Sequence, residues 1–450
     1  MPIKTAHITN YYHKDSGGIR TAYNSLLAAA ERRKCPMFLI VPGETEEVVR
    51  LSDYTKIYYV PASTSPLADK RYRLIMPWQY IPNGSIVRRI LMEEMPDVIE
   101  VRDKYALSIF GTVVRIGKFE ELNRPMLVSY SSERMDDNVA TYVSKGRFFR
   151  WIARRYMGNY IIPSFDYHMT NSPYTAEEFF LSTLNKHNPR RMNRFTNWCW
   201  RRLRGPRVPL EERVRIRPPG VNIDTFSRDR KDPAFREAMI RRSGGSENSV
   251  LIIYAGRIAP EKNVALLVDL MDLLSKDGTC DYRLLVAGGG PLAEWLQDEA
   301  DKRCPGRITQ LGHLDKAELA NYYANADVFV HPNPREPFGI GPLEAMASGV
   351  PVVVPDSGGL LSYASDENAW VTPPAAESYA AAIVEIVSQP DLRSQKISRA
   401  FEAVEANVQS NAAERMLETY HELFDDFNSR KELFADTEAA KKFDYISLLG

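Results

Sequence analysis

The sequence predicts an α/β protein with two lobes, each built on a parallel sheet. Short runs rich in β-branched residues alternate with longer helical patterns along the whole chain, as in strand–helix–strand units. At 450 residues the chain is too long for one hydrophobic core. The segment 216–226 is dense in proline and glycine and interrupts the alternation. We therefore predict two Rossmann-like, doubly wound lobes that face each other across a cleft.

The predicted strands justify this fold one by one. In the first lobe they span residues 4–9, 37–41, 56–60, 97–101, 126–130 and 167–170. In the second lobe they span residues 250–255, 283–287, 307–311, 327–331, 352–354 and 369–371. Helices are expected between most of them, for example over 19–31, 264–275, 291–302 and 317–325. Ligands of open α/β sheets bind where the strands end, so the loops after these strands should carry the function.

We place the boundary between the lobes at about residue 215. The first lobe is then 1–214 and the second 215–408, and a C-terminal helix within 409–450 returns to the first lobe. The charged tail after about residue 428 is expected to fray. Residues 62–96 include a loop too long for a simple connection, which is typical of a functional or mobile segment.

Composition excludes several classes of protein. The 58 basic and 58 acidic residues cancel, so no global field draws the chain to nucleic acid. Four cysteines without a Cys-x-x-Cys pair indicate reduced thiols rather than disulfides or zinc. The first ten residues lack the apolar run of a signal peptide, and no stretch approaches the roughly 20 apolar residues of a spanning helix. We expect a cytoplasmic protein, peripheral to the inner face of a membrane at most.

One basic segment allows two interpretations. Residues 181–210 carry eight lysines or arginines, no acidic residue, and both Trp198 and Trp200. The segment is either a solvated insertion or a patch for anionic lipid or a charged acceptor, because cations with interfacial aromatics favour a headgroup layer.

The most constrained segment, HPNPREPFGIGPLEA, runs from His331 to Ala345 between a predicted strand and a helix. Glu336 and Glu344 flank its glycine- and proline-rich part. The free N–H groups at a helix start suit a phosphate. A carboxylate one turn into the helix can accept hydrogen bonds from a vicinal diol such as that of a ribose. His331 could serve acid–base chemistry, but a strand-end histidine held by the fold is as good an interpretation.

A second motif follows the strand 250–255, where Gly256 and Arg257 precede Lys262 at a helix start. Cations there can neutralise a pyrophosphate and stabilise a departing nucleoside diphosphate without a metal. Glycine turns at 17–18 and 288–290 also open helices, where glycine lets a backbone approach a ligand. An ordinary tight turn explains these glycines as well, and Ala293 stands where a dinucleotide fingerprint has its third glycine.

These motifs resemble those of the retaining glycosyltransferases of family 4, which have the GT-B fold. The Gly-Arg-x4-Lys-Asn and Glu-x7-Glu elements match directly, and the resemblance is most specific from Ala255 to Gly349. It implies transfer of a sugar from a nucleoside-diphosphate-sugar, held mainly by the second lobe, to a hydroxyl acceptor that enters from the first. It assigns Arg257 and Lys262 to the leaving group, Glu336 to sugar hydroxyls and Glu344 to the ribose. The donor-binding residues it implies are Gly17, Gly18, Gly256, Gly288, Gly290, Pro291, Phe338, Gly339, Ile340, Gly341, Pro342, Leu343 and Glu344.

Segments 100–104 and 128–136 resemble the branch that includes phosphatidylinositol- and other α-mannosyltransferases. The resemblance places Asp103, Ser132, Glu133 and Arg134 on the acceptor and sugar side. Relatives carry histidine where this chain has Ser132, a shorter side chain with no titratable proton. We read this departure as a sign of a different donor sugar, such as one without a primary 6-hydroxyl.

No cofactor beyond the nucleotide-sugar co-substrate is expected, and no metal is assigned. Asp136 and Asp137 sit at a predicted helix start, where adjacent acids more often complement the helix dipole than bind a metal. The acceptor is a glycan, a lipid-linked molecule or a small molecule. Two alternatives stay open: another nucleotide-sugar enzyme of this fold, such as an epimerase or phosphorylase, or a nucleotide-sugar-binding protein with little turnover.

Overall fold

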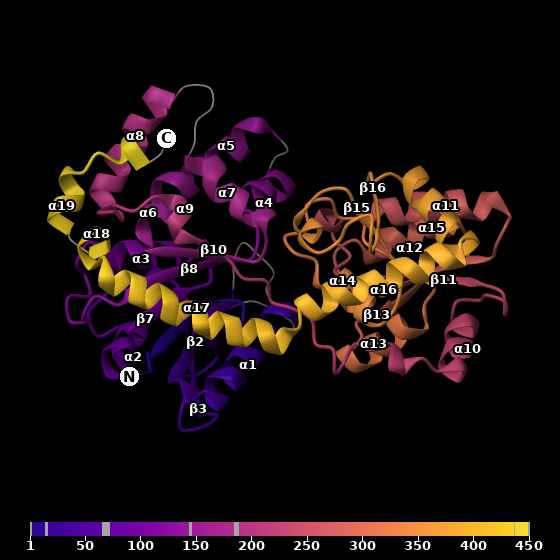
Figure 1. Cartoon of the computed structure of the whole chain (residues 1–450), viewed down its shortest axis with the longest axis horizontal. Helices are drawn as coiled ribbons and strands as arrows, with labels where there is room; N and C mark the ends of the chain where they lie inside the picture. The colour runs from indigo at the N-terminus through magenta and orange to yellow at the C-terminus, as the bar shows by residue number, and fades with distance from the viewer. Residues whose placement is uncertain are drawn as a thin grey trace. The chain divides into compact units, whose positions relative to one another are not determined.

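The computed structural model of the chain describes residues 2–13, 17–64, 73–143, 146–183, 189–435 and 437–448. The chain forms two compact units (Figure 1): Met1–Pro219 with Ser410–Gly450, and Gly220–Gln409. The chain therefore passes between the units twice, after Pro219 and after Gln409. The sequence suggested the first of these boundaries near residue 215 and the second near residue 408.

The first unit is built on an eight-stranded sheet that is parallel except for one edge strand, β3. In spatial order its strands are β10 (Val214–Ile216), β9 (Tyr167–Thr170), β8 (Met126–Ser131), β7 (Val98–Val101), β1 (Thr5–Ile8), β2 (Met37–Gly43), β4 (Thr55–Pro61) and β3 (Glu47–Arg50). A separate hairpin pairs β5 (Ser63–Thr64) with β6 (Arg73–Leu74). The six strands predicted for this lobe are confirmed, whereas the short strands β3, β5, β6 and β10 were not foreseen.

The second unit contains a six-stranded, fully parallel sheet. In spatial order its strands are β13 (Ile308–Gly312), β12 (Tyr282–Ala287), β11 (Val250–Ala255), β14 (Val328–Val330), β15 (Val352–Pro355) and β16 (Trp370–Thr372). Each one matches a predicted strand, so the predicted α/β class of both lobes is confirmed.

Helices cover both faces of each sheet, because successive strand residues point to opposite sides. In the first unit they are α1 (Gly17–Arg32), η1 (Pro77–Gln79), α2 (Ile86–Glu94), α3 (Ser108–Arg115), α4 (Met135–Tyr142), α5 (Arg147–Tyr156), η2 (Met157–Ile161), α6 (Ile162–Ser164), α7 (Pro173–Thr183), α8 (Pro189–Leu203), α9 (Leu210–Arg213), α17 (Gln409–Ser429), α18 (Lys431–Ala435), α19 (Thr437–Lys442) and η6 (Tyr445–Leu448). One core layer lies between the sheet and α2, α3 and α8, and the other lies between the sheet and α1 and α17.

The second unit repeats this arrangement. Its helices are η3 (Arg228–Arg230), α10 (Pro233–Arg242), η4 (Pro260–Lys262), α11 (Ala265–Asp277), α12 (Ala293–Arg303), α13 (Lys316–Asn325), α14 (Ile340–Ala347), η5 (Gly359–Ser362), α15 (Ala376–Ser388) and α16 (Pro390–Ala406). On β11, Leu251 and Ile253 join the core under α10, α13, α14 and α16, whereas Ile252 and Tyr254 join the core under α11, α12 and α15. This alternation buries the strand on both sides, which explains its continuous apolar sequence.

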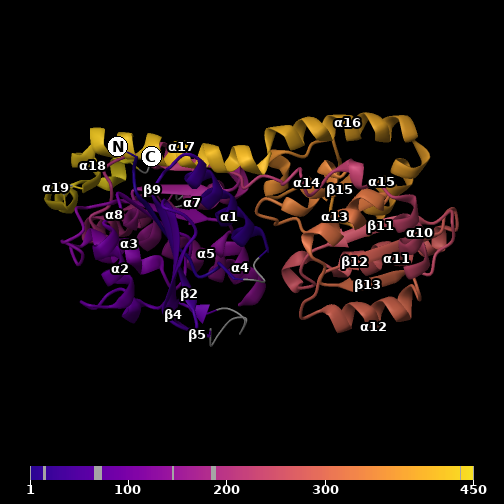
Figure 2. The ribbon, with the colours of Figure 1, turned by 90° about the horizontal axis from the view of Figure 1, so that it is seen from below.

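The C-terminal segment packs on the first unit (Figures 1 and 2), where α17 and α18 lie along one side. Tyr420 of α17 donates a hydrogen bond to Glu100 of β7, and its side chain is fully buried. The expectation that the tail frays after about residue 428 is wrong, because Phe434 and Tyr445 are buried as well. The backbone N–H of Tyr445 donates to Asn197 of α8 at 2.9 Å.

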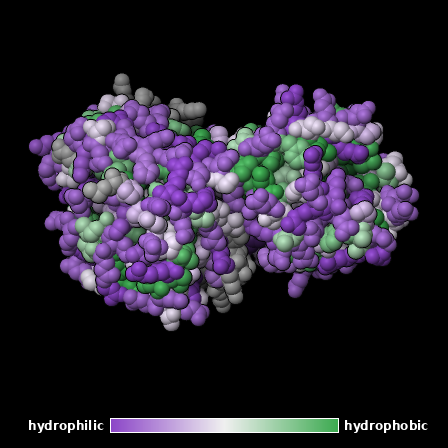
Figure 3. Space-filling view, turned by 60° about the horizontal axis from the view of Figure 1, so that its bottom comes forward, coloured by the Kyte–Doolittle hydropathy of each residue, from purple (hydrophilic) through white to green (hydrophobic). Residues whose placement is uncertain are grey.

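The outer surface differs from this interior. The face of the molecule shown in Figure 3 is mostly hydrophilic, with scattered apolar side chains. Among the described residues, no helix is both long and apolar enough to cross a membrane. All four cysteines are free thiols, as the sequence predicted.

Candidate active site

Each of the two large sheets has a switch point. There, successive strands stop adding to one side of the central strand and begin to add to its other side. In the second unit, β11 has β12 on one side and β14 on the other. In the first unit, β1 lies between β2 and β7 in the same way. Loops that leave neighbouring strands in opposite directions at such a point open a crevice, where ligands of this fold class bind. The predicted motifs follow β11 and β14, so the structure brings them together.

Glu336 is the centre of the second-unit site. Lys262 Nζ lies 2.7 Å from Glu336 Oε2, and Asn333 Nδ2 donates to the same oxygen at 3.0 Å. His331 Nε2 lies 3.2 Å from it. Burial alone would raise the pKa of this carboxyl, but the charge of Lys262 and the contact with His331 outweigh burial and hold the pKa well below its usual range. Glu336 is therefore ionised at any physiological pH.

Glu344, eight residues later, has the opposite environment. Glu344 lies within α14 and is only 8% exposed. Burial raises the pKa of its carboxyl to about 7, and the smaller effect of Lys316 in the opposite direction does not cancel this rise. None of the described residues donates a hydrogen bond to this carboxylate. A buried acceptor without a donor is costly in a folded protein and usually indicates a missing ligand or water. Glu344 can thus accept hydrogen bonds from a bound diol.

Arg257 lies at the end of β11 with its side chain 42% exposed. Its guanidinium is 3.8 Å from the carboxylate of Glu261. Between Arg257 and Lys262, the residues Ile258 and Ala259 are buried and fix the start of η4. The structure therefore places Lys262 in the Glu336 cluster and Arg257 at the surface of the same loop.

The glycines after β12 are required by close packing of two loops. A side chain at Gly288 would meet the carbonyl oxygen of Gly256 at 2.0 Å, and one at Gly290 would meet that of Ile258 at 2.3 Å. Ile258 N–H donates to the carbonyl of Gly289 at 3.0 Å, which ties the loops together. The tight-turn interpretation thus accounts for both glycines, and their contact with a donor stays a prediction, as does that of the exposed Pro291.

The segment between the two glutamates is largely buried. Phe338 and Leu343 belong to the hydrophobic core, and the ring of Phe338 packs edge-on against Tyr363 at 5.2 Å between centroids. Gly339 has φ +81°, which favours glycine, and its carbonyl accepts a hydrogen bond from the Tyr363 hydroxyl. Phe338 and Leu343 can therefore touch a donor only through their backbone. Ile340 and Gly341, by contrast, are half-buried in the first turn of α14.

In the first unit, Asp103 and Ser132 follow neighbouring strands, β7 and β8. Asn10 Nδ2 donates to Asp103 at 2.6 Å, and burial raises the pKa of the Asp103 carboxyl to about 6. Arg102 Nε donates to the Ser132 hydroxyl at 2.9 Å. The hydroxyl of Ser132 is therefore already held by a cation that stacks 4.2 Å above the ring of Tyr130.

The other residues predicted on this side have mixed positions. The carbonyl of Glu133 accepts a hydrogen bond from Lys104. Arg134 is buried, and its guanidinium is bound to Asp136 at 3.0 Å and Glu177 at 2.7 Å, so it braces the unit. A contact of Arg134 with a ligand stays a prediction. Gly17 and Gly18 begin α1, and Gly18 is exposed. The rest of that loop, Asp15 and Ser16, lies outside the described residues.

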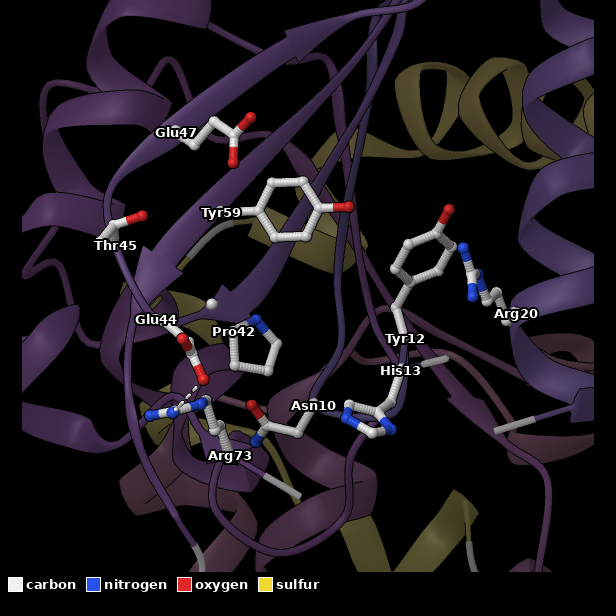
Figure 4. Close-up of a pocket in the computed structure, with 11 residues that line it drawn as sticks. Asn10, Tyr12, His13, Arg20, Pro42, Glu44, Thr45, Glu47, Tyr59 and Arg73 are labelled. Carbon is white, nitrogen blue, oxygen red and sulfur yellow. Dashed lines mark hydrogen bonds and ion pairs between the residues drawn. The ribbon is translucent and has the colours of Figure 1, made fainter. Parts of the chain in front are cut away.

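A pocket of about 450 Å³ lies at the carboxyl ends of β1, β2 and β4 (Figure 4). It mixes aromatic rings with both charges, and Arg73 is paired with Glu44 at 2.7 Å. It is lined by Asn10, Tyr12, His13, Arg20, Pro42, Gly43, Glu44, Thr45, Glu47, Tyr59 and Arg73.

The sequence did not indicate this pocket. Its signal was the position of residues 42–45 directly after a predicted strand, and Arg73 comes from the long loop that the sequence marked as unusual. Asn10 joins the pocket to Asp103, since it lines the pocket and also bonds that carboxylate.

Comparisons with known proteins show which family part of the chain resembles. Residues 235–403 match the model of the family described as "Glycosyl transferases group 1". The chain is 27% identical over 398 residues to a GDP-mannose-dependent α-(1-6)-phosphatidylinositol dimannoside mannosyltransferase of Mycobacterium tuberculosis, covering 88% of this chain and 91% of the relative. It is 22% identical over 437 residues to an α-monoglucosyldiacylglycerol synthase of Streptococcus pneumoniae, covering 96% and 89%.

A solved structure supports the fold. Sucrose-phosphate synthase from Thermosynechococcus elongatus matches with a TM-score of 0.69 at 19% identity, over 94% of this chain and all of that one. The matched family model spans the loops that hold Lys262, Glu336 and Glu344. Residues 235–403 therefore match the group 1 glycosyltransferases, and the chain as a whole has the GT-B fold.

Proposed function

We propose that the protein is a retaining glycosyltransferase that moves a sugar from a nucleoside-diphosphate-sugar to a hydroxyl acceptor. The proposal rests on the pair Glu336 and Glu344, which follow β14 next to the switch point between β11 and β14. Glu336 is held ionised by Lys262, and Glu344 is buried with no donor from the described residues. Such a pair suits a ligand with a charged diphosphate between a sugar and a ribose.

Glu344 would accept hydrogen bonds from the ribose diol, which replace the water that burial removes. Lys262 and Arg257 would bind the diphosphate, and Lys262 would then divide its charge between the ligand and Glu336. Glu336 would orient the hydroxyls of the transferred sugar. The first turn of α14 would offer its backbone N–H groups to the same diphosphate.

The proposed reaction is a front-face displacement. The acceptor oxygen forms a bond to the anomeric carbon on the face from which the diphosphate leaves, and the bond from that carbon to the phosphate oxygen breaks. The acceptor's proton passes to the departing phosphate oxygen. Charge grows on the diphosphate as the bond breaks, so the nearby cations stabilise the transition state more than the ground state. We propose that no metal is needed for this step.

The acceptor would be held by the first unit. The pocket at β1, β2 and β4 offers aromatic rings from Tyr12 and Tyr59 and charged groups from Arg20 and Glu47, a combination that suits a polyhydroxylated molecule. The names of the two relatives describe a mannosyltransferase for a phosphatidylinositol dimannoside and a synthase of a glucosylated diacylglycerol. We therefore favour a lipid-linked acceptor over a soluble one.

Donor binding tests the proposal. Thermal-shift assays with UDP-, GDP-, ADP- and dTDP-sugars should find a donor that stabilises the wild type and stabilises Glu344→Gln less. Turnover of that donor with sugar and glycolipid acceptors should yield a transfer product. Release of free sugar or of an epimer as the main product would favour the alternative enzymes, and binding without turnover would favour a binding protein. Clear preference for GDP-mannose over all 6-deoxy and pentose donors would refute our interpretation of Ser132.

A further inference from the structure

Helix α5 carries an unusual concentration of large apolar groups on its surface. Phe148 is 63% exposed and Trp151 48%, and their rings stack at 5.9 Å between centroids. Phe149 and Ile152 are exposed on the same two turns. Scattered single apolar residues are normal on a protein surface, but a contiguous cluster indicates contact with something apolar.

The rest of the helix is firmly attached to the first unit. Ala153 is buried, Arg154 binds Asp136 at 2.8 Å, and Arg155 donates to the carbonyl of Ser182. Beyond Tyr156 the chain continues into η2, which is mostly buried. The aromatic end of α5 is thus a fixed projection, because its base is held by ion pairs and core packing.

The basic residues around the aromatic cluster of α5 indicate what kind of partner it fits. From residue 138 to residue 165 the sequence contains five lysines or arginines and no acidic residue. Arg147 is exposed beside the aromatic cluster, and the side chain of Arg150 is 37% exposed despite lying 3.6 Å from Asp137. A second copy of the chain bound through this face would bring like charges together, which disfavours self-association. Phosphate headgroups above an acyl layer complement both the cations and the rings.

We propose that the exposed end of α5 docks the protein onto an anionic lipid bilayer. The rings would enter the interfacial layer, where amphipathic aromatic groups are stable, while the arginines would bind lipid phosphates. This goes beyond the proposed transfer reaction, since docking requires neither donor nor turnover.

The basic segment 181–210, for which the sequence left a lipid patch open, offers a weaker surface of the same kind. On α8, Phe195 and Trp198 are exposed and stacked at 5.8 Å, and Arg202 lies over the Trp198 ring. Trp200, however, is buried and donates to the carbonyl of Gly158 at 2.8 Å. Residues 184–188 of that segment lie outside the described residues. The α8 face therefore has two exposed rings, fewer than α5, and serves as the internal comparison.

The test is co-sedimentation of the full chain with phosphatidylcholine vesicles, with and without phosphatidylglycerol. The wild type should bind the anionic vesicles in dilute buffer and lose most binding in about 1 M salt, where the Debye length is about 3 Å. The double variant Phe148→Ser/Trp151→Ser should lower the partition coefficient by about tenfold or more. Arg147→Glu should lower it by about tenfold and Arg147→Lys only slightly.

Matched controls make the result specific. Trp295→Ser removes an exposed tryptophan from α12 of the second unit and should bind like the wild type. Melting temperatures near the wild-type value would show that the variants fold. The proposal is overturned if the wild type ignores anionic vesicles, if the α5 variant binds them unchanged, or if Phe195→Ser/Trp198→Ser alone abolishes binding. It is also overturned if the α5 variant changes only the oligomeric state in gel filtration.

Discussion

Glu336 and Glu344 have the same side chain, but their surroundings shift the pKa values of their carboxyl groups in opposite directions. Lys262 and His331 surround the first, so the pKa of Glu336 falls well below its usual range although burial opposes the fall. Burial raises the pKa of the second to about 7. Pairs of acids whose environments separate their pKa values are typical of sites in which each acid has its own role.

Kinetics should separate these roles. We expect Glu344→Ala to raise the donor KM with a smaller effect on kcat, because ribose binding is the same in the ground and transition states. Glu336→Ala should mainly lower kcat, because orientation of the sugar matters most at the transition state. Glu377→Ala, on the first turn of α15, is a control far from the site in sequence. Wild-type rates and affinities in both site variants would contradict the assignment.

Glu344 should also make stability depend on pH. Its pKa is raised in the folded chain, so the folded state binds more protons than the unfolded state between the ordinary glutamate pKa and about 7. Stability from this group is therefore present at low pH and is lost as the pH rises through about 7. Each pKa unit is about 1.4 kcal/mol, which makes the loss a few kcal/mol at most.

Urea unfolding of the wild type and of Glu344→Gln at pH 5 and pH 8 measures this loss. The glutamine variant should gain stability relative to the wild type between the two pH values, by about 1–3 kcal/mol. A difference between the two proteins that is the same at both pH values would show that the carboxyl is not desolvated as described.

A third prediction concerns Arg257 and Lys262, the two cations of the loop after β11. Removing Lys262 or Arg257 should lower kcat by a factor on the order of 10²–10³, the range for a lost electrostatic stabiliser. Lys262→Met should have the larger effect, because it also leaves Glu336 without its ion-pair partner. We expect EDTA to leave most wild-type activity. Activity that survives the double substitution would exclude both cations as stabilisers of the leaving group.

At the scale of elements, the buried parallel strands were predictable because both of their faces are apolar. In β11 every residue from Val250 to Tyr254 is buried, and such a run is distinctive in sequence. The loops after β11 and β14 were predictable for a different reason, since they combine glycine with charged residues at fixed spacing. The pocket in the first unit was not predictable, because its lining comes from five separate segments that only the fold brings together.

Helix α8 shows what composition alone does not predict. Its arginines suggested a solvated or lipid-facing insertion, and the charged tail suggested fraying, but the two segments bury each other. Trp200 packs edge-on against Tyr445 at 5.3 Å, and Arg201 donates to the carbonyl of Phe443 at 2.6 Å. A long-range contact of this kind leaves no local pattern in the sequence.

The two tryptophans of α8 should therefore respond differently to substitution. Trp200→Ala should destabilise the protein by about 3–5 kcal/mol, since it opens a cavity in the core and leaves the carbonyl of Gly158 without its donor. Trp198→Ala, at an exposed position, should change the free energy of unfolding by about 0.5 kcal/mol or less. Urea titrations of both variants measure this, and equal losses would contradict the packing of α8.

At the scale of the whole molecule, the chain is two α/β units with the same order of growth around a central strand. The first unit is completed by the last 41 residues, Ser410–Gly450, and Tyr420 ties them to Glu100 of β7. The switch points of the two sheets carry the candidate donor site and, next to Asp103, the candidate acceptor pocket. Removal of the C-terminal segment should therefore unfold the first unit and not merely shorten the chain.

We propose that the sugar is transferred with retention of its anomeric configuration. The most direct measurement is a proton NMR time course of the reaction, with the donor found by thermal shift and a glycolipid acceptor. An α-linked donor should give a product whose first detectable anomeric signal is α, at a rate that Lys262→Met lowers strongly. A first product with the β configuration, or transfer at an unchanged rate in Lys262→Met, would contradict the proposed mechanism.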